Sequence, residues 1–278
     1  MNAHDEYAAT AGFHLENPNG SEVVVLLHGL GADHRQPLDL VAGLDFSDVA
    51  VLAPDVRAHG LSKVIGERSD FLFDELVADL VALMQRLAQS EKPVHLVGIS
   101  MGAAIALRAS LASTLDVKSL ALIRPAFSDV PLPSNLRVMS RIGDLLRERE
   151  PSEARRLFIG TEDYRSVAEI TQIGAASLLS QFDAPLATER AVRLRSVPRN
   201  VAYADRAELG RVPVPALVIG TENDPVHPLP LAYNWRYGIP EGTFAVVPPR
   251  DSDPLATARH TRRLVHSHLL GQKTASWR

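Results

Sequence analysis

The chain has 278 residues, of which 46% are hydrophobic and 22% charged, and these values predict one large globular domain. Its formal net charge of −4, with no long run of one sign, argues against binding to nucleic acid or to an anionic membrane. Cysteine is absent, which excludes disulfides, thiolate metal sites and a cysteine nucleophile. No leader-like or membrane-spanning apolar run is found, so we expect a cytoplasmic protein.

Runs of aliphatic residues recur through the first half of the chain and predict strands. The longer runs are continuous rather than alternating, which is typical of strands covered on both faces in a parallel sheet. The expected strands are a short one at 13–15 and longer ones at 23–27, 49–53, 94–97 and 120–123. Apolar residues at helical spacing predict a helix over 74–89, and small and aliphatic residues predict another over 103–111.

The pattern changes between residues 126 and 205, where helix-forming residues dominate. Helices are expected near 140–149, 152–159, 163–181 and 185–196, then strands at 214–220 and 243–247 and a last helix over 254–270. This alternation predicts an α/β fold with a doubly wound, mostly parallel sheet. We expect residues 1–125 and 206–278 to form the core, and residues 126–205 to be a helical cap inserted before the penultimate strand.

A serine lies in a sequence pattern typical of a nucleophile. Residues 98–102, Gly-Ile-Ser-Met-Gly, match G-x-S-x-G, in which a sharp strand-to-helix turn raises the serine hydroxyl above the sheet. A predicted buried strand precedes the pattern and a helix of small residues follows it, which is the required context. The alternative interpretation is an ordinary strand–turn–helix in which Ser100 is incidental.

A second loop is expected to complete an oxyanion hole. Acyl transfer needs two backbone N–H groups that face the developing negative charge. Met101, directly after the serine, supplies one of them. The loop at 28–31, His-Gly-Leu-Gly, follows a buried strand and is expected to supply the other from Leu30.

Four segments together resemble the α/β-hydrolase superfamily in order and spacing, over almost the whole chain. They are HGLG at 28–31, DVRAHGLS at 55–62, HLVGISMG at 95–102 and GTENDPVHP at 220–228. The resemblance implies that Asp224 is the acid that orients the catalytic histidine. Considered alone, Asp224 also fits a turn or N-cap residue before Pro225. Asp55, Arg57 and His59 are usually structural in this family, so we give them no catalytic role.

The general base is where the sequence departs from the family. The resemblance implies a histidine shortly after the last strand, but Ser252 occupies that position, and a hydroxyl is no base near neutral pH. His227, three residues after Asp224, is one substitute, although the spacing is cramped. In the meta-cleavage C–C hydrolases the matching residue lines the pocket, so His227 is alternatively a substrate contact or structural. His260 is another substitute, and the last alternative is that no base exists.

The leading hypothesis is a hydrolase of a small ester, lactone, thioester or related carbonyl substrate. Ser100 attacks, Leu30 and Met101 form the oxyanion hole, and Asp224 orients His227. The alternatives are a lyase, cyclase or isomerase on the same scaffold, or a degenerate ligand-binding protein. No nucleotide-binding or metal-binding motif is found, so we expect no cofactor and no metal. The sequence does not predict the oligomeric state.

Two further sets of residues lie in the predicted cap. Six large apolar residues are expected either to line the substrate pocket or to form the core of the cap itself: Phe127, Leu136, Phe158, Tyr164, Leu178 and Phe182. Four arginines share one face of a predicted helix: Arg190, Arg193, Arg195 and Arg199. For these arginines a solvated face is favoured over an anion-binding patch.

Overall fold

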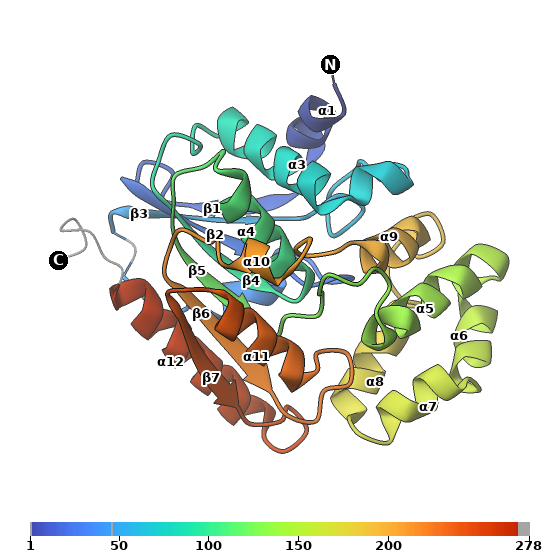
Figure 1. The fold of residues 1–278 in the computed structure, drawn as a ribbon. Helices are drawn as coiled ribbons and strands as arrows, with labels where there is room; N and C mark the ends of the chain where they lie inside the picture. The colour runs from blue at the N-terminus through green and yellow to red at the C-terminus, as the bar shows by residue number, and fades with distance from the viewer. Residues whose placement is uncertain (1, 46, 272–278) are drawn as a thin grey trace.

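The computed structural model describes residues 2–45 and 47–271, and in these ranges a seven-stranded sheet forms the centre of the molecule (Figure 1). Its strands are β1 (Phe13–Glu16), β2 (Glu22–Leu27), β3 (Val49–Pro54), β4 (Val94–Ile99), β5 (Val117–Ile123), β6 (Ala216–Thr221) and β7 (Gly242–Val247). Their order is β1-β3-β2-β4-β5-β6-β7, and β1 pairs antiparallel with β3 while the other pairs are parallel. The predicted doubly wound, mostly parallel sheet is confirmed.

Helices cover both faces of the sheet, because successive residues of a strand point to opposite sides. One apolar cluster joins Val23, Val25 and Leu27 of β2 to the helices on one face, and another joins Val24 and Leu26 to those on the other. The first face is covered by α3 (Phe73–Arg86), α4 (Met101–Ala112) and α11 (Leu229–Gly238). The second face is covered by the loop after α2 (Arg35–Leu38) and by α12 (Pro254–Gly271).

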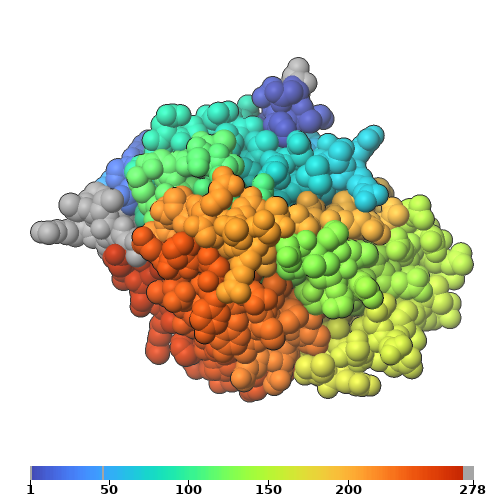
Figure 2. Space-filling view, in the orientation of Figure 1, coloured from blue at the N-terminus to red at the C-terminus, as the bar shows by residue number. Residues whose placement is uncertain are grey.

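The short helix α10 (Arg206–Leu209) directly precedes β6, and the other five α-helices between β5 and β6 form one end of the molecule in Figures 1 and 2. They are α5 (Arg137–Glu148), α6 (Pro151–Ile159), α7 (Glu162–Ala168), α8 (Gln172–Leu179) and α9 (Ala191–Ser196), with short 3-10 turns at Ser134–Leu136 and Val197–Arg199. An apolar cluster of their own, which includes Ile142, Phe158 and Leu194, lies inside this group. We call residues 126–205 the helical block.

Several elements differ from the sequence expectations. The helix expected over 163–181 is two helices, because the Thr171 side chain accepts the N–H of Gly174 and starts a new helix there. The helix α1 (Ala3–Thr10), which begins with a capping box at Asn2, and the helix α11 were not expected. No helix among the described residues is long and apolar enough to span a bilayer.

Two buried histidines hold together the loops at the carboxyl edge of the sheet. The Nε2 atom of His28 accepts the N–H of Val56 at 3.0 Å, and the Nε2 atom of His59 accepts the N–H of Gly31 at 3.0 Å. Since a backbone amide can only donate, both Nε2 atoms carry no proton, and each Nδ1–H donates to a carbonyl at 2.8 Å. Both side chains are therefore neutral, and burial lowers the pKa of each below the ordinary value for histidine.

This burial predicts that stability falls on mild acidification. The unfolded chain takes up protons on these histidines below about pH 6.5, whereas the folded chain does not. The free energy of unfolding should therefore decrease below about pH 6.5, by about 1.4 kcal/mol per pH unit for each histidine. Urea unfolding at a series of pH values measures this slope. His59→Gln should have a shallower slope, and the control His14→Gln, at a partly exposed strand position, should have the wild-type slope. A free energy of unfolding that does not change with pH would contradict the assignment.

Candidate active site

The chain makes a strained turn at Ser100, between the last residue of β4 and the first of α4. Ser100 has φ 55° and ψ −108°, a combination that non-glycine residues rarely adopt. The glycines on either side permit the close packing: a Cβ on Gly98 would lie 2.2 Å from the carbonyl oxygen of Gly102, and one on Gly102 would lie 2.2 Å from that of Leu27. The sharp turn expected from the sequence pattern is thus present.

A hydrogen-bonded relay leads from the serine hydroxyl to a carboxylate. The Ser100 Oγ atom lies 2.9 Å from Nε2 of His227, and the Nδ1 atom of this ring lies 2.9 Å from Oδ2 of Asp224. The other carboxylate oxygen accepts the N–H groups of Val226 and His227, both at 3.2 Å. The cramped spacing of three residues is therefore accommodated by a tight turn that the carboxylate itself stabilises.

The carboxylate of Asp224 is held in its ionised form. Burial alone would raise its pKa, but the adjacent His227, its hydrogen bonds and the guanidinium of Arg124 lower this pKa well below the ordinary value. The Nη1 atom of Arg124 lies 3.9 Å from Oδ2 of Asp224. An ionised carboxylate accepts the Nδ1–H of the imidazole, which leaves Nε2 free to accept the serine proton.

The other candidate positions lie away from this relay. His260 is exposed on α12, and Ser252, at the position where the family carries its histidine, is exposed in the loop between β7 and α12. Next to it, Asp251 accepts the hydroxyl of Thr171 and, at 2.9 Å, the N–H of Ile173. Of the two candidate histidines, the structure brings only His227 to the serine.

Two backbone amides beside the serine are free to bind a negative charge. In the loop after β2, the N–H of Gly29 donates to Gln36 at 2.8 Å and that of Gly31 to His59 at 3.0 Å, but within the described chain the N–H of Leu30 has no acceptor. Met101 is the first residue of α4, where a helix leaves its N–H groups unpaired. The geometry is compatible with the expected oxyanion hole.

A cavity of about 70 Å³ lies over the serine and is lined by core and helical block together. The six apolar residues singled out in the sequence divide between the two expected roles. Phe127, Leu136 and Leu178 line the cavity. Phe158, Tyr164 and Phe182 instead pack on one another inside the helical block, with ring centroids 5.5 Å and 5.4 Å apart around Phe158.

Comparison with known proteins identifies the family. Residues 24–266 match the alpha/beta hydrolase family, which is most of the chain. The chain belongs to this family. A comparison with curated proteins gave no match.

Solved structures share the fold of this hydrolase. A thermophilic esterase from Thermogutta terrifontis has a TM-score of 0.68 at 20% identity, with 95% of each chain covered. The enol-lactonase from Burkholderia xenovorans LB400 has a TM-score of 0.68 at 19% identity, covering 94% of this chain and 96% of that one. MenH from S. aureus has a TM-score of 0.67 at 17% identity, covering 95% and 99%. At these identities the likeness extends to the fold alone.

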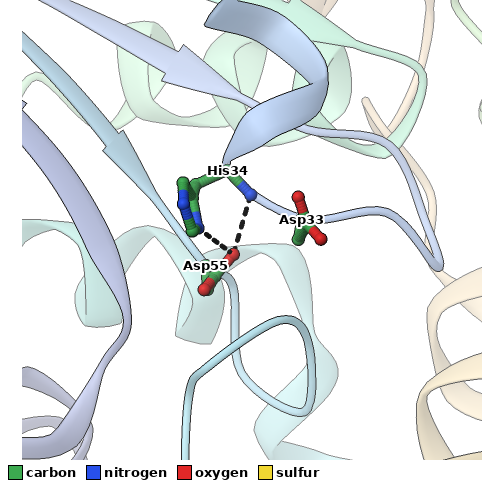
Figure 3. A group of neighbouring side chains, drawn as sticks. All are labelled: Asp33, His34 and Asp55. Atoms are coloured by element: carbon green, nitrogen blue, oxygen red, sulfur yellow. Dashed lines mark hydrogen bonds and ion pairs between the residues drawn. The ribbon is translucent and has the colours of Figure 1, made fainter. Parts of the chain in front are cut away.

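A second group of polar side chains lies near the same edge of the hydrolase sheet (Figure 3). One ligand-type atom from each of Asp33, His34 and Asp55 lies within 4.8 Å of the others. Asp55, however, accepts the backbone N–H of His34 at 2.7 Å, its Nδ1–H at 3.0 Å and the N–H of Leu61 at 2.7 Å. Asp33 binds Arg35 instead. These contacts fix the loops, and we assign the group a structural role.

Sequence reasoning missed three polar residues of the hydrolase site. Arg250 and Gln181 line the cavity over Ser100, and Arg124 lies behind Asp224. The only local signal was for Arg124, which directly follows a predicted strand on the sheet edge where ligands bind in such folds. The other two come from the helical block and from the loop after β7, so no local pattern places them.

The glycine after the turn gives a direct test of the site's packing. Gly102→Ala should lower the free energy of unfolding by about 1–3 kcal/mol, because its Cβ meets the backbone of Leu27. Gly160→Ala is the control, since a Cβ there meets nothing closer than 3.4 Å. Thermal or urea unfolding measures both variants. Equal stabilities would contradict the close approach of β2 to the start of α4.

Proposed function

We propose that this protein is a serine hydrolase of a small ester, lactone, thioester or related carbonyl substrate, with Ser100, His227 and Asp224 as its catalytic residues. The observation that carries the proposal is the continuous relay of two 2.9 Å contacts from Ser100 through His227 to Asp224. A nucleophile within hydrogen-bond reach of a base, which a third group orients, is the arrangement that activates a hydroxyl.

Each residue has a defined step in this proposal. Ser100 Oγ bonds to the carbonyl carbon while its proton passes to Nε2 of His227, and Asp224 stabilises the resulting imidazolium. The N–H groups of Leu30 and Met101 bind the oxyanion. The tetrahedral intermediate collapses as the leaving group takes the proton from His227. Water then attacks the acyl-enzyme, its proton passes to the same nitrogen, and the acid is released with Ser100 restored.

The relay also favours the hydrolase over the alternative functions. The lyase, cyclase or isomerase and the degenerate binding protein were alternatives because the usual position of the base holds Ser252. His227 reaches Ser100 from the loop after β6, so that reason no longer favours them. The esterase and enol-lactonase among the structural neighbours support an acyl-transfer reaction by analogy of fold.

We further propose that the helical block, residues 126–205, is a cap that sets substrate size. Met139, Ser177 and Leu178 of the block line the cavity over Ser100. At about 70 Å³ this cavity is small, which suits a short acyl group. Asp251 holds the start of α8 in place over the serine.

A fluorophosphonate probe tests the nucleophile and the base. Wild-type protein should label covalently, Ser100→Ala should not label, and His227→Ala should label about 100-fold more slowly or less, because the general base is lost. His260→Ala is the matched control and should label at the wild-type rate. Mass spectrometry of the labelled peptide gives the rates and the position. If His227→Ala labelled as fast as the wild type, the proposed base would be wrong.

The small cavity predicts a preference for short acyl chains. Acetate and butyrate esters of 4-nitrophenol should have kcat/KM values about tenfold or more above those of the octanoate ester, since the longer chain exceeds the cavity. Met139→Ala should shift this preference toward longer chains, because the side chain lines the cavity. Leu157→Ala, on the exposed side of α6, is the control. A chain-length profile that is flat, or identical in both variants, would argue against the cap as size filter.

A further inference from the structure

A second cavity, larger than the one over Ser100, lies where the helical block meets the core. It has a volume of about 370 Å³. We call it the arginine cavity, and it is lined by Gly31, Ala32, Asp33, His34, Arg35, Gly60, Leu61, Ala184, Pro185, Arg190 and Arg193. Nothing in the proposed chemistry at Ser100 uses it.

Two of its arginines are buried and have no acidic partner in the described part of the chain. Arg190 is 7% exposed and Arg193 is 3% exposed, so the expectation of a solvated arginine face is wrong for both. Arg190 donates to the carbonyl oxygens of Gly60 at 2.9 Å and Ser62 at 3.0 Å, and Arg193 donates to that of Ala58. The Nε atoms of both arginines are buried and have no hydrogen-bond partner among residues 2–45 and 47–271.

Other arginines of the chain have the carboxylate partners that Arg190 and Arg193 lack among the described residues. The buried Arg57 forms hydrogen bonds of 2.9 Å and 2.7 Å with Asp79, and in the helical block Arg195 lies 2.7 Å from Asp144. Among the residues that the structure describes, neither Arg190 nor Arg193 lies within ion-pair distance of a carboxylate. A buried charge without a counterion is costly, so such a pair indicates a place for an anion.

The remaining charged groups of the cavity leave this positive charge uncompensated. Asp33 is engaged by Arg35 at 2.5 Å, and Asp55 behind the wall is engaged by His34 and the N–H of Leu61. The nearby imidazole of His59 is neutral. Burial and the neighbouring Arg190 lower the pKa of Arg193 to about 10, which still leaves its guanidinium charged at neutral pH.

The arginine cavity adjoins the Ser100 site through one thin wall. Gly31 lines the arginine cavity, and its neighbour Leu30 lines the cavity over Ser100. The side chain of Gln181, which also lines the Ser100 cavity, lies directly on Gly31, where an added Cβ would be 2.0 Å from its Oε1 atom. Gln181 is 4% exposed, and its side chain forms part of the wall between the two cavities.

We propose that the arginine cavity binds the anionic group, a carboxylate or phosphate, of a substrate whose carbonyl lies at Ser100. Guanidinium groups suit both anions, since their planar donor sets match carboxylate and phosphate oxygens. The part of this inference that concerns the substrate rests on the proposed hydrolase function. The anion site itself does not, because Arg190 and Arg193 bind the anion whether or not Ser100 is reactive.

Anion binding is tested on the whole protein by thermal unfolding. Sodium phosphate and sodium succinate are titrated at constant ionic strength, with sodium chloride making up the balance. The melting temperature of the wild type should rise with at least one of these anions above the chloride control, and the larger rise identifies phosphate or carboxylate as the preferred group. No rise with either anion would overturn the proposal.

A variant at the mouth of the cavity locates the site without removing an arginine. Leu61 is 71% exposed, so Leu61→Glu should fold, and its carboxylate should compete for Arg190 and Arg193. Leu61→Gln is the matched neutral control. The rise in melting temperature should vanish in Leu61→Glu and persist in Leu61→Gln. Equal rises in the two variants would place the bound anion elsewhere and overturn the proposal.

Ester hydrolysis then connects the anion site to Ser100. The comparison is between the 4-nitrophenyl half-ester of succinic acid and the neutral 4-nitrophenyl butyrate. The kcat/KM value of the half-ester, divided by that of the butyrate ester, should be about 10- to 100-fold lower in Leu61→Glu than in Leu61→Gln. This is the effect expected for loss of a charge-assisted contact. An unchanged ratio would overturn the substrate assignment. An anion-dependent melting temperature in a protein whose Ser100 is inert would instead refute the proposed function and leave the anion site standing.

Discussion

The tight turn from Asp224 to His227 is the constraint on which the site depends. Asn223, just before it, has φ 55°, and the turn then closes as one oxygen of Asp224 accepts the N–H groups of Val226 and His227. The other oxygen is left to hold the imidazole, whose far nitrogen lies 2.9 Å from Ser100. The proposed acid and base therefore come from one loop after β6, and their relative geometry does not require the loop after β7.

The loop after β7 makes other contacts in this structure. In the sequence pattern of the family that loop carries the histidine, whereas here Asp251 binds the start of α8 and Arg250 lines the cavity over Ser100. The loop thus fixes the helical block relative to the relay and adds a cation to the cavity wall. In this protein the loop after β7 binds the helical block at Thr171 and Ile173 instead of carrying a histidine.

The features that were predicted correctly from the sequence are those that neighbouring residues determine. The turn at Ser100 follows from a buried strand, two glycines and a helix of small residues within about 20 positions, and the sheet follows from continuous aliphatic runs. The sequence left the base open between His227, His260 and none, because side-chain direction in a three-residue turn depends on backbone angles that composition does not specify. The anchoring of Thr171 and the burial of Arg193 depend on partners far along the chain, Asp251 and Ala58.

The buried arginines couple the helical block to the machinery at Ser100. They donate to carbonyl oxygens of residues 58–62, and the same loop carries His59, which accepts the N–H of Gly31 beside Leu30. A displacement of α9 would therefore be transmitted through one short loop to the amide proposed for the oxyanion. An anion bound at Arg190 and Arg193 would neutralise the charge buried at this junction and favour the docked position of α9. In this proposal the charge of the substrate and the conformation of the loop at 28–31 are linked, because residues 58–62 contact both the arginines and Gly31.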